Sequence, residues 1–186
     1  MVQNMDVSSA TDVLLTLLYA PGNSNKYREP IKGITRLEKL MFLLSRETSL
    51  KEIITRNYAF DAYDYGPFSN EILDDIEALK SSNILKEISY SGEKLEYIDL
   101  QESEMNVYED ISSIPSFKRY ELTEKGEVIG KFLFDSLSDS QRNELIKIKK
   151  IYNSLPIKEL LSYVYNTYPE VTKKSVIKDK ILKYHY

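Results

Sequence analysis

Residues 63–79 read YDYGPFSNEILDDIEAL and are the most informative part of the sequence about the fold. An aromatic extended run ends at Gly66-Pro67, a pair that allows a sharp turn and then fixes φ before a helix. Ser69 is the predicted N-cap, because a serine oxygen can accept a hydrogen bond from a free amide of the first turn. The buried edge of the predicted helix follows from helical spacing and contains Phe68, Ile72, Ile76 and Leu79, with Leu73 beside it.

The opposite side of this predicted helix is acidic. It carries Glu71, Asp74 and Glu77, with Asp75 at the margin, and its first basic residue is Lys80. A helix that inserts into the major groove of DNA directs basic residues at phosphates, whereas carboxylates there would be repelled. The pattern therefore disfavours groove insertion, and we predict that Glu71, Asp74 and Glu77 contact a protein partner.

Two helices are predicted before this stretch. Ser9 and Asp12 have capping spacing ahead of residues 13–18, which are apolar on nearly all sides, as is typical of a buried helix. Thr35 and Glu38 form a capping-box pattern at the start of the second helix. The apolar stripe of the second helix contains Leu37, Leu40, Met41 and Leu44.

The other sides of the second predicted helix suggest two kinds of surface. Phe42 and Leu43 fall off the apolar stripe, so they need a second packing partner, either inside this chain or on another protein. We include both as predicted partner-binding residues. Arg36, Lys39 and Arg46 lie roughly opposite the stripe and form a candidate basic patch for nucleic acid.

Strands are predicted after residue 83. Residues 84–90 and 94–100 flank a turn at Ser91-Gly92, residues 101–117 are an irregular acidic loop, and residues 118–123 are a third short strand. Thr123 is the predicted N-cap of a helix over residues 124–137. The order of three helices, a hairpin and a strand is the winged-helix arrangement. The predicted fold class is α+β and mostly helical, with a winged-helix-like core and a small antiparallel β-wing over residues 1–137.

Residues 138–186 are predicted to be a helical extension packed on this core as part of one structural domain. Ser138 with Gln141 is a capping box, and Pro156 suits a helix start. The tail is basic through Lys173, Lys174, Lys178 and Lys180. Two interpretations of the tail stay open, a nucleic-acid contact and a solvated amphipathic helix that covers the core with Val176, Ile177, Ile181 and Tyr184.

Composition excludes several chemistries. The 186 residues contain no cysteine, so disulfides, thiolate nucleophiles and cysteine-bound metals are excluded. The single histidine is His185, and the sequence has no P-loop, GxGxxG or HExxH motif. Glu71 and Asp75 could hold a cation by spacing, but a solvated acidic face explains them more simply. We therefore expect no enzyme activity, no cofactor and no metal.

Charge and hydropathy indicate the character of the surface and the expected cellular location. The net charge is −4, yet residues 141–186 hold 10 Lys/Arg against 4 Asp/Glu, so the body is acidic and the C-terminal part basic. No signal peptide and no window of about 18–20 apolar residues is present, so we expect a cytoplasmic protein with no membrane contact.

Four stretches together resemble the YwgA-like and SocA/Panacea group of bacterial and archaeal proteins. They are RLEKLMFLL at 36–44, YDYGPFSNEILDDIEAL at 63–79, YELTEKG at 120–126 and IYNSLPIKELLSYVYNTYP at 151–169. The resemblance implies a winged-helix-like α+β fold and, in the Panacea branch, an antitoxin domain that neutralises a toxin by direct contact. The chain looks closer to the YwgA-like side, because of YDYGPFS and its helical tail. No catalytic residues of the family carry over.

Two functions follow as expectations. The first is a non-enzymatic macromolecule-binding protein whose partner is a protein, for which a basic RNA-cleaving toxin is one candidate. The alternative is a winged-helix DNA-binding regulator that uses the basic patches of the second helix and the tail. A homodimer is compatible with both.

Overall fold

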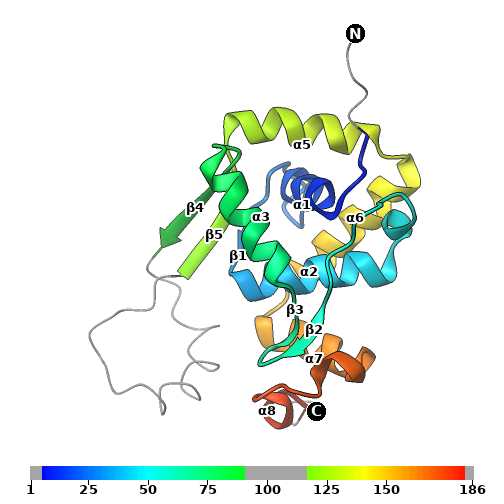
Figure 1. The fold of residues 1–186 in the computed structure, drawn as a ribbon, viewed down its shortest axis with the longest axis vertical. Helices are drawn as coiled ribbons and strands as arrows, with labels where there is room; N and C mark the ends of the chain where they lie inside the picture. Colours follow the sequence, from blue (N-terminus) through cyan, green and yellow to red (C-terminus); the bar gives the residue numbers. More distant parts are fainter. Residues whose placement is uncertain (1–5, 91–116, 183–186) are drawn as a thin grey trace.

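The computed structural model describes residues 6–90 and 117–182 and shows a mostly helical α+β fold with small antiparallel sheets (Figure 1). One hydrophobic core runs through it and contains side chains from before and after residue 138, for example Leu40 and Leu160. None of the described helices combines the length and apolar character that crossing a bilayer requires.

The first helix confirms its sequence prediction. α1 (Ala10–Tyr19) begins with a capping box in which Ser9 and Asp12 each accept a bond from the other's backbone amide. Such reciprocal bonds satisfy amides that have no partner within the helix. Nearly all of its residues are buried, as the apolar run predicted.

The second helix starts differently from the prediction. β1 (Ile31–Lys32) leads through Gly33 into α2 (Ile34–Glu47), so Thr35 and Glu38 lie inside the helix and form no capping box. Gly33 occupies the N-cap position with φ of 86°, a conformation that glycine adopts without steric cost. Its amide donates to the Lys118 carbonyl oxygen at 2.8 Å, so the start of α2 is set by the sheet.

The Gly66-Pro67 pair belongs to a strand and does not end the extended segment. After η1 (Ser49–Glu52), β2 (Asp61–Tyr63) and β3 (Gly66–Phe68) form a hairpin that leads into α3 (Asn70–Ser81). Gly66 has φ of 88°, and a Cβ there would lie 2.8 Å from Cε1 of Tyr165. Glycine is therefore required both by the backbone and by the packing of α7.

α3 confirms its predicted buried edge except at two residues. Ile72, Ile76 and Leu79 are buried, whereas Phe68 is half-buried and Leu73 is 37% exposed. Ser69 does occupy the N-cap position, but its side chain caps nothing and its buried hydroxyl has no hydrogen-bond partner.

The main sheet has the strand order β1-β5-β4. β4 (Leu85–Tyr90) and β5 (Phe117–Leu122) confirm two predicted strands and pair antiparallel, with Leu85 opposite Leu122. β1 joins the other edge of β5 and was not predicted, because two residues carry no periodic signal. The predicted strand at 94–100, the turn at Ser91-Gly92 and most of the predicted loop lie outside the described residues.

Two C-terminal helices begin at the predicted caps. Thr123 caps α5 (Glu124–Ser136), and Ser138 and Gln141 form the capping box of α6 (Asp139–Tyr152). Pro156 precedes α7 (Ile157–Thr167), which is followed by η2 (Pro169–Thr172) and α8 (Lys178–Leu182).

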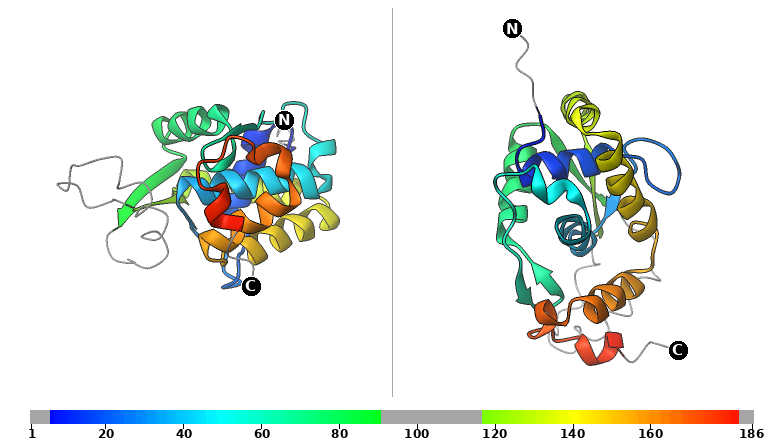
Figure 2. Two further views of the ribbon diagram at one scale, coloured as in Figure 1. Left: turned by 90° about the horizontal axis from the view of Figure 1, so that it is seen from below. Right: turned by 90° about the vertical axis from the view of Figure 1, so that its right-hand side faces the viewer.

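The tail packs at the end of the molecule where the β2–β3 hairpin lies (Figure 2). Ser175 connects the two, because its Oγ lies 2.8 Å from the Tyr165 hydroxyl and donates to the Asp64 carbonyl at 3.0 Å. Ile177 and Ile181 are buried as predicted, but Val176 is 66% exposed because its amide bonds to the same Asp64 carbonyl and turns the side chain outward. Tyr184 lies outside the described residues.

Candidate functional site

Phe42 and Leu43 are fully buried, so the prediction that they contact a partner protein is wrong. Phe42 packs edge-on against Phe60 and Tyr168, with ring centroids 5.3 and 5.1 Å away. The guanidinium of Arg46 lies 5.3 Å from the centre of the same ring. The second packing partner of this helix is therefore inside the chain.

The basic patch predicted on α2 is also wrong for two of its three residues. Arg36 is buried and donates to the carbonyl oxygens of Tyr152 and Leu155, at 3.0 and 2.7 Å, where α6 ends. Lys39 is buried and donates to the Pro67 carbonyl oxygen at 2.8 Å. Both side chains bind backbone from elements that pack onto α2, and neither is available to phosphates.

The remaining basic candidates are exposed or partly exposed. Arg46, Lys173 and Lys174 are exposed and Lys178 is half-buried, while the Lys180 side chain lies outside the described part of the structure. Of the predicted basic residues whose side chains the structure describes, these three and the half-buried Lys178 are therefore the ones that a nucleic acid could contact.

Glu38 and Lys39 form a buried charged pair next to the hairpin. Glu38 Oε2 lies 3.5 Å from Lys39 Nζ, and Glu38 Oε1 has no hydrogen-bond partner. Burial raises the pKa of Glu38 to about 7, although Lys39 opposes the shift. Burial likewise lowers the pKa of Lys39 to about 8, and Glu38 opposes that shift. Keeping either group charged at this buried position therefore costs free energy.

The raised pKa of Glu38 predicts how the free energy of unfolding depends on pH. Because the folded pKa of Glu38 lies above its ordinary 4.5, the folded protein binds more protons than the unfolded chain between about 4.5 and 7. The stability of the wild type relative to Glu38→Gln should fall by about 2–3 kcal/mol across that window as pH rises. Urea unfolding of both proteins measures the difference, with the exposed Glu159→Gln as the control. A flat difference would show that Glu38 titrates normally.

The acidic side of α3 divides into an inner and an outer half. Asp75 accepts bonds from the hydroxyls of Thr11 and Tyr58, at 2.5 and 2.6 Å, and Glu71 accepts from the Ala59 amide at 2.9 Å. Asp74 and Glu77 are exposed, and Glu77 pairs with Lys80 at 2.8 Å. Of the predicted acidic contact surface, Asp74 and Glu77 face solvent, whereas Glu71 is partly used within the fold.

The inner carboxylates hold a segment that we call the strap, residues 53–60. One side of the strap pairs with the start of α1, where the Thr55 amide donates to Ser8 and the Ala10 amide donates to Arg56, at 2.9 and 3.0 Å. The other side is held by Glu71 and Asp75. Burial, together with the bond to Asp75, raises the pKa of Tyr58, so its hydroxyl stays a donor. Sequence reasoning missed the strap, because it is irregular and its partners are distant in the chain.

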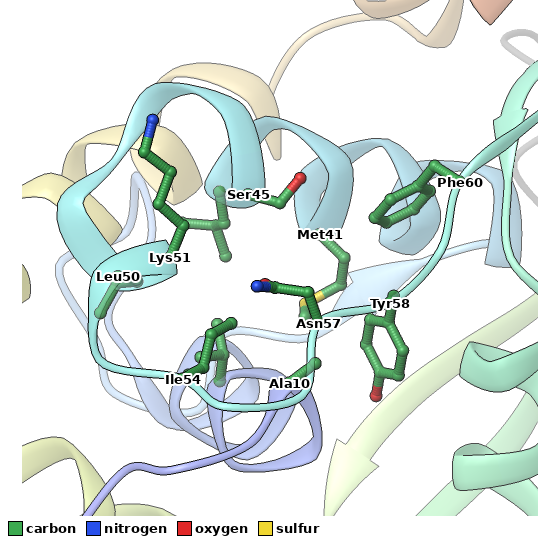
Figure 3. Close-up of a pocket in the computed structure, with 11 residues that line it drawn as sticks. Ala10, Met41, Ser45, Leu50, Lys51, Ile54, Asn57, Tyr58 and Phe60 are labelled. Carbon is green, nitrogen blue, oxygen red and sulfur yellow. The ribbon is translucent and has the colours of Figure 1, made fainter.

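Two hollows flank the strap and share Ala10 and Tyr58. The apolar hollow, a shallow depression with a cavity volume of about 10 Å³, lies between the strap, α1, α2 and η1 (Figure 3). The acidic hollow, a cavity of about 60 Å³, is lined by the start of α1, the strap and α3. Its remaining lining residues are Ser9, Thr11, Arg56, Glu71, Asp74 and Asp75.

The bonds at Asp75 predict how firmly the strap is held. Asp75→Ala removes the acceptor of Thr11 and Tyr58, and we expect a loss of about 1–3 kcal/mol in unfolding free energy. Limited proteolysis within the strap should accelerate as well. Asp74→Ala, one residue away and exposed, is the matched control and should change neither quantity. Equal behaviour of the two variants would show that Asp75 does not hold the strap.

The site offers hydrogen bonding, negative charge and an apolar surface. Within residues 6–90 and 117–182, no three His, Asp or Glu side chains are grouped so that they could hold a metal ion.

The chain matches no protein-family model, no curated protein and no solved structure at a significant level. The resemblance to the YwgA-like and SocA/Panacea group therefore rests on the four sequence stretches quoted above.

Proposed function

We propose that this chain is a non-enzymatic binding protein with a winged-helix-like core, which works in the cytoplasm by direct contact with another protein. The observation that carries the proposal is the outer side of α3. Asp74 and Glu77 are exposed there, and Leu73, which lies next to Asp74 in the sequence and one turn before Glu77, is 37% exposed. A surface that combines carboxylates with an accessible apolar side chain suits a protein partner better than a phosphate backbone.

Charge favours a basic partner. Carboxylates on an exposed helix attract a positively charged surface, and this attraction speeds association and weakens with salt. Under the resemblance to antitoxin domains, a basic toxin is the candidate partner. The contact would block the toxin without any chemistry by this chain.

A DNA-binding regulator is the second candidate, and it is favoured by the exposed tail residues Lys173 and Lys174 together with Arg46. The burial of Arg36 and Lys39 weakens it, because those side chains were most of the basic patch on α2. Binding to random duplex DNA between about 50 and 200 mM salt separates the candidates, since a phosphate contact is steeply salt-dependent. A protein-binding module should show no such binding.

The test of the proposal begins with the partner. Crosslinking in native cells identifies a bound protein, which is then purified and titrated against the chain. We expect the double variant Asp74→Lys/Glu77→Lys to weaken binding at least about tenfold, because two attractive charges become repulsive. Glu159→Lys/Glu170→Lys makes the same change of charge at exposed positions on α7 and η2, and it should bind normally. Equal binding by both double variants would refute a contact through α3.

A further inference from the structure

The outer side of α5 leaves two large apolar side chains in solvent. Val128 is 70% exposed and Phe132, one turn further along the helix, is 42% exposed. The other side of α5 carries the buried Leu133 and Phe134 and packs against α1, and Figure 1 shows the helix along the edge of the molecule. A single exposed apolar side chain is ordinary on a protein surface, so the pattern around these two decides whether they mark a contact.

That pattern is the spacing of a coiled-coil seam. Lys125, Val128, Phe132 and Asp135 follow one another at intervals of three, four and three residues. The same alternation lines up side chains where two helices of a coiled coil meet. Lys125 and Asp135 are exposed as well, so all four side chains are accessible. We call these four residues the seam; its middle is apolar and its two ends carry opposite charges.

The seam is complementary to itself in one orientation only. Its four residues are placed symmetrically about position 130, and a two-fold antiparallel pairing joins residues at equal distances on either side of that centre. Val128 then meets Phe132 of the second copy, and Lys125 meets Asp135 of the second copy. A parallel pairing would instead set lysine against lysine and aspartate against aspartate, and such like-charge contacts cost free energy.

We infer that α5 is a homodimer interface, in which the seam of one chain packs antiparallel against the seam of a second copy. Burial of Val128 and Phe132 favours the contact, and the two symmetric lysine–aspartate pairs select the antiparallel orientation. The inference goes beyond the proposed function, because Asp74 and Glu77, which carry that proposal, lie on α3 and are not part of the seam.

The charged ends of the seam have bonding capacity left for a second copy. Lys125 donates to the Ser82 carbonyl oxygen at 3.0 Å, and an ammonium group has three donors. Asp135 pairs with Lys131 one turn before it, and a carboxylate has two oxygens that accept. The Lys131–Asp135 pair is exposed, and pairs of that kind contribute little free energy. It therefore competes weakly with a contact across the dimer.

The size of the seam predicts a weak dimer. α5 has 13 residues, so it is about 20 Å long. Two helices of that length bury less surface than the roughly 1,200–2,000 Å² of a stable interface. We therefore expect a dissociation constant on the order of 10–100 µM.

The first test measures self-association and uses two exposed valines. Sedimentation equilibrium of the full chain between about 5 and 500 µM covers the expected range of affinity. Val128→Asp places a charge in the apolar middle of the seam and should weaken dimerisation at least about tenfold. Val176→Asp makes the same exchange at a valine that is 66% exposed in the tail, and it should dimerise as the wild type does.

The second test is an exchange of charges that reads the orientation. Lys125→Asp and Asp135→Lys, each alone, set like charges against each other twice in the symmetric dimer, and each should weaken it about fivefold. The double variant Lys125→Asp/Asp135→Lys re-forms both pairs with their charges exchanged and should restore wild-type dimerisation. A parallel dimer would show no such rescue. Thermal unfolding checks that each variant is folded.

Several outcomes would overturn the inference. A chain that stays monomeric at the highest concentration has no such interface, and equal effects of Val128→Asp and Val176→Asp would place the interface elsewhere. Failure of the double charge variant to rescue dimerisation would reject the antiparallel seam. Loss of native-partner binding in Val128→Asp, in a chain that does not self-associate, would assign the seam to that partner.

The proposed function fails or holds separately. Its partner titration depends on Asp74 and Glu77, and a monomeric Val128→Asp chain that still binds the native partner would support both statements. A dimer that Asp74→Lys/Glu77→Lys leaves intact, in a chain whose partner binding is also unchanged by that double variant, would support the seam while refuting the contact through α3.

Discussion

Replacing Lys149 with methionine should lower the free energy of unfolding by about 3–5 kcal/mol. Lys149 is completely buried in α6, and its ammonium donates to the carbonyl oxygens of Leu17, Leu18 and Ala20, at 2.8, 3.2 and 2.7 Å. The last carbonyl groups of a helix have no hydrogen-bond partner within the helix, and a cation near them also interacts favourably with the negative end of the helix dipole. Lys149 therefore caps the end of α1 from 129 to 132 positions away in the sequence.

Methionine is the informative replacement because it keeps the unbranched shape and most of the length of the side chain and removes its three donors. The carbonyl oxygens then remain buried without partners, and each such group costs about 1–3 kcal/mol. Burial lowers the pKa of Lys149 to about 7, so the charge is costly in place and the three acceptors offset that cost.

Urea unfolding at constant pH measures the effect, and Lys150→Met is the matched control. The ammonium of Lys150 bonds to the exposed side chain of Asn25, so its loss should change stability by about 0.5 kcal/mol or less. A small loss in Lys149→Met, similar to that in the control, would mean that water or another group satisfies the end of α1.

Replacing Gly126 with alanine should destabilise the fold by about 2–4 kcal/mol, although the same exchange in a helix ordinarily stabilises by up to about 1 kcal/mol. A Cβ at residue 126 would lie 2.0 Å from the carbonyl oxygen of Ile84. That oxygen cannot easily move, because it accepts the Thr123 amide at 3.0 Å and the Thr123 hydroxyl at 3.1 Å. The first turn of α5 and the start of β4 would have to separate.

The sign of the change decides this prediction. Thermal or urea unfolding of Gly126→Ala is compared with Glu124→Ala, an exposed exchange in the same first turn that should stay within about 1 kcal/mol. A stabilised Gly126→Ala would show that α5 shifts away from Ile84 at little cost. Gly130→Ala should fall between the two, since its nearest contacts would be 3.0–3.2 Å away.

The features that sequence reasoning predicted correctly are those whose causes lie within a few residues. The capping boxes at Ser9 and Ser138 and the cap at Thr123 depend on a side chain and an amide three positions apart. The buried edge formed by Ile72, Ile76 and Leu79 depends on helical spacing alone. The exposed positions of Asp74 and Glu77 follow from the same spacing, because they lie on the other side of the helix.

Only one part of the candidate site could be predicted, because sequence patterns report local causes and the rest of the site depends on contacts distant in the chain. The acidic helix is visible in the sequence, but the two hollows exist because the strap crosses from α1 to α3. The strap has no periodicity, and the bond that joins Asp75 to Thr11 connects residues 64 positions apart. Such a contact leaves no local pattern to read.

The starts of α1, α5 and α6 and the two-sided character of α3 could be predicted from the sequence, since amide capping and apolar spacing act over one or two turns. Which sides of α2 face water depends instead on the elements that pack against it in three dimensions. Arg36, Lys39 and Phe42 read as a polar and a spare apolar surface, yet α6, α7 and the β2–β3 hairpin cover them and supply carbonyl oxygens and aromatic rings as partners. Burial depends on what packs against a residue. The hydrogen-bond partners of Arg36 and Lys39 lie 28 to 119 positions away in the sequence, so no local pattern reveals them.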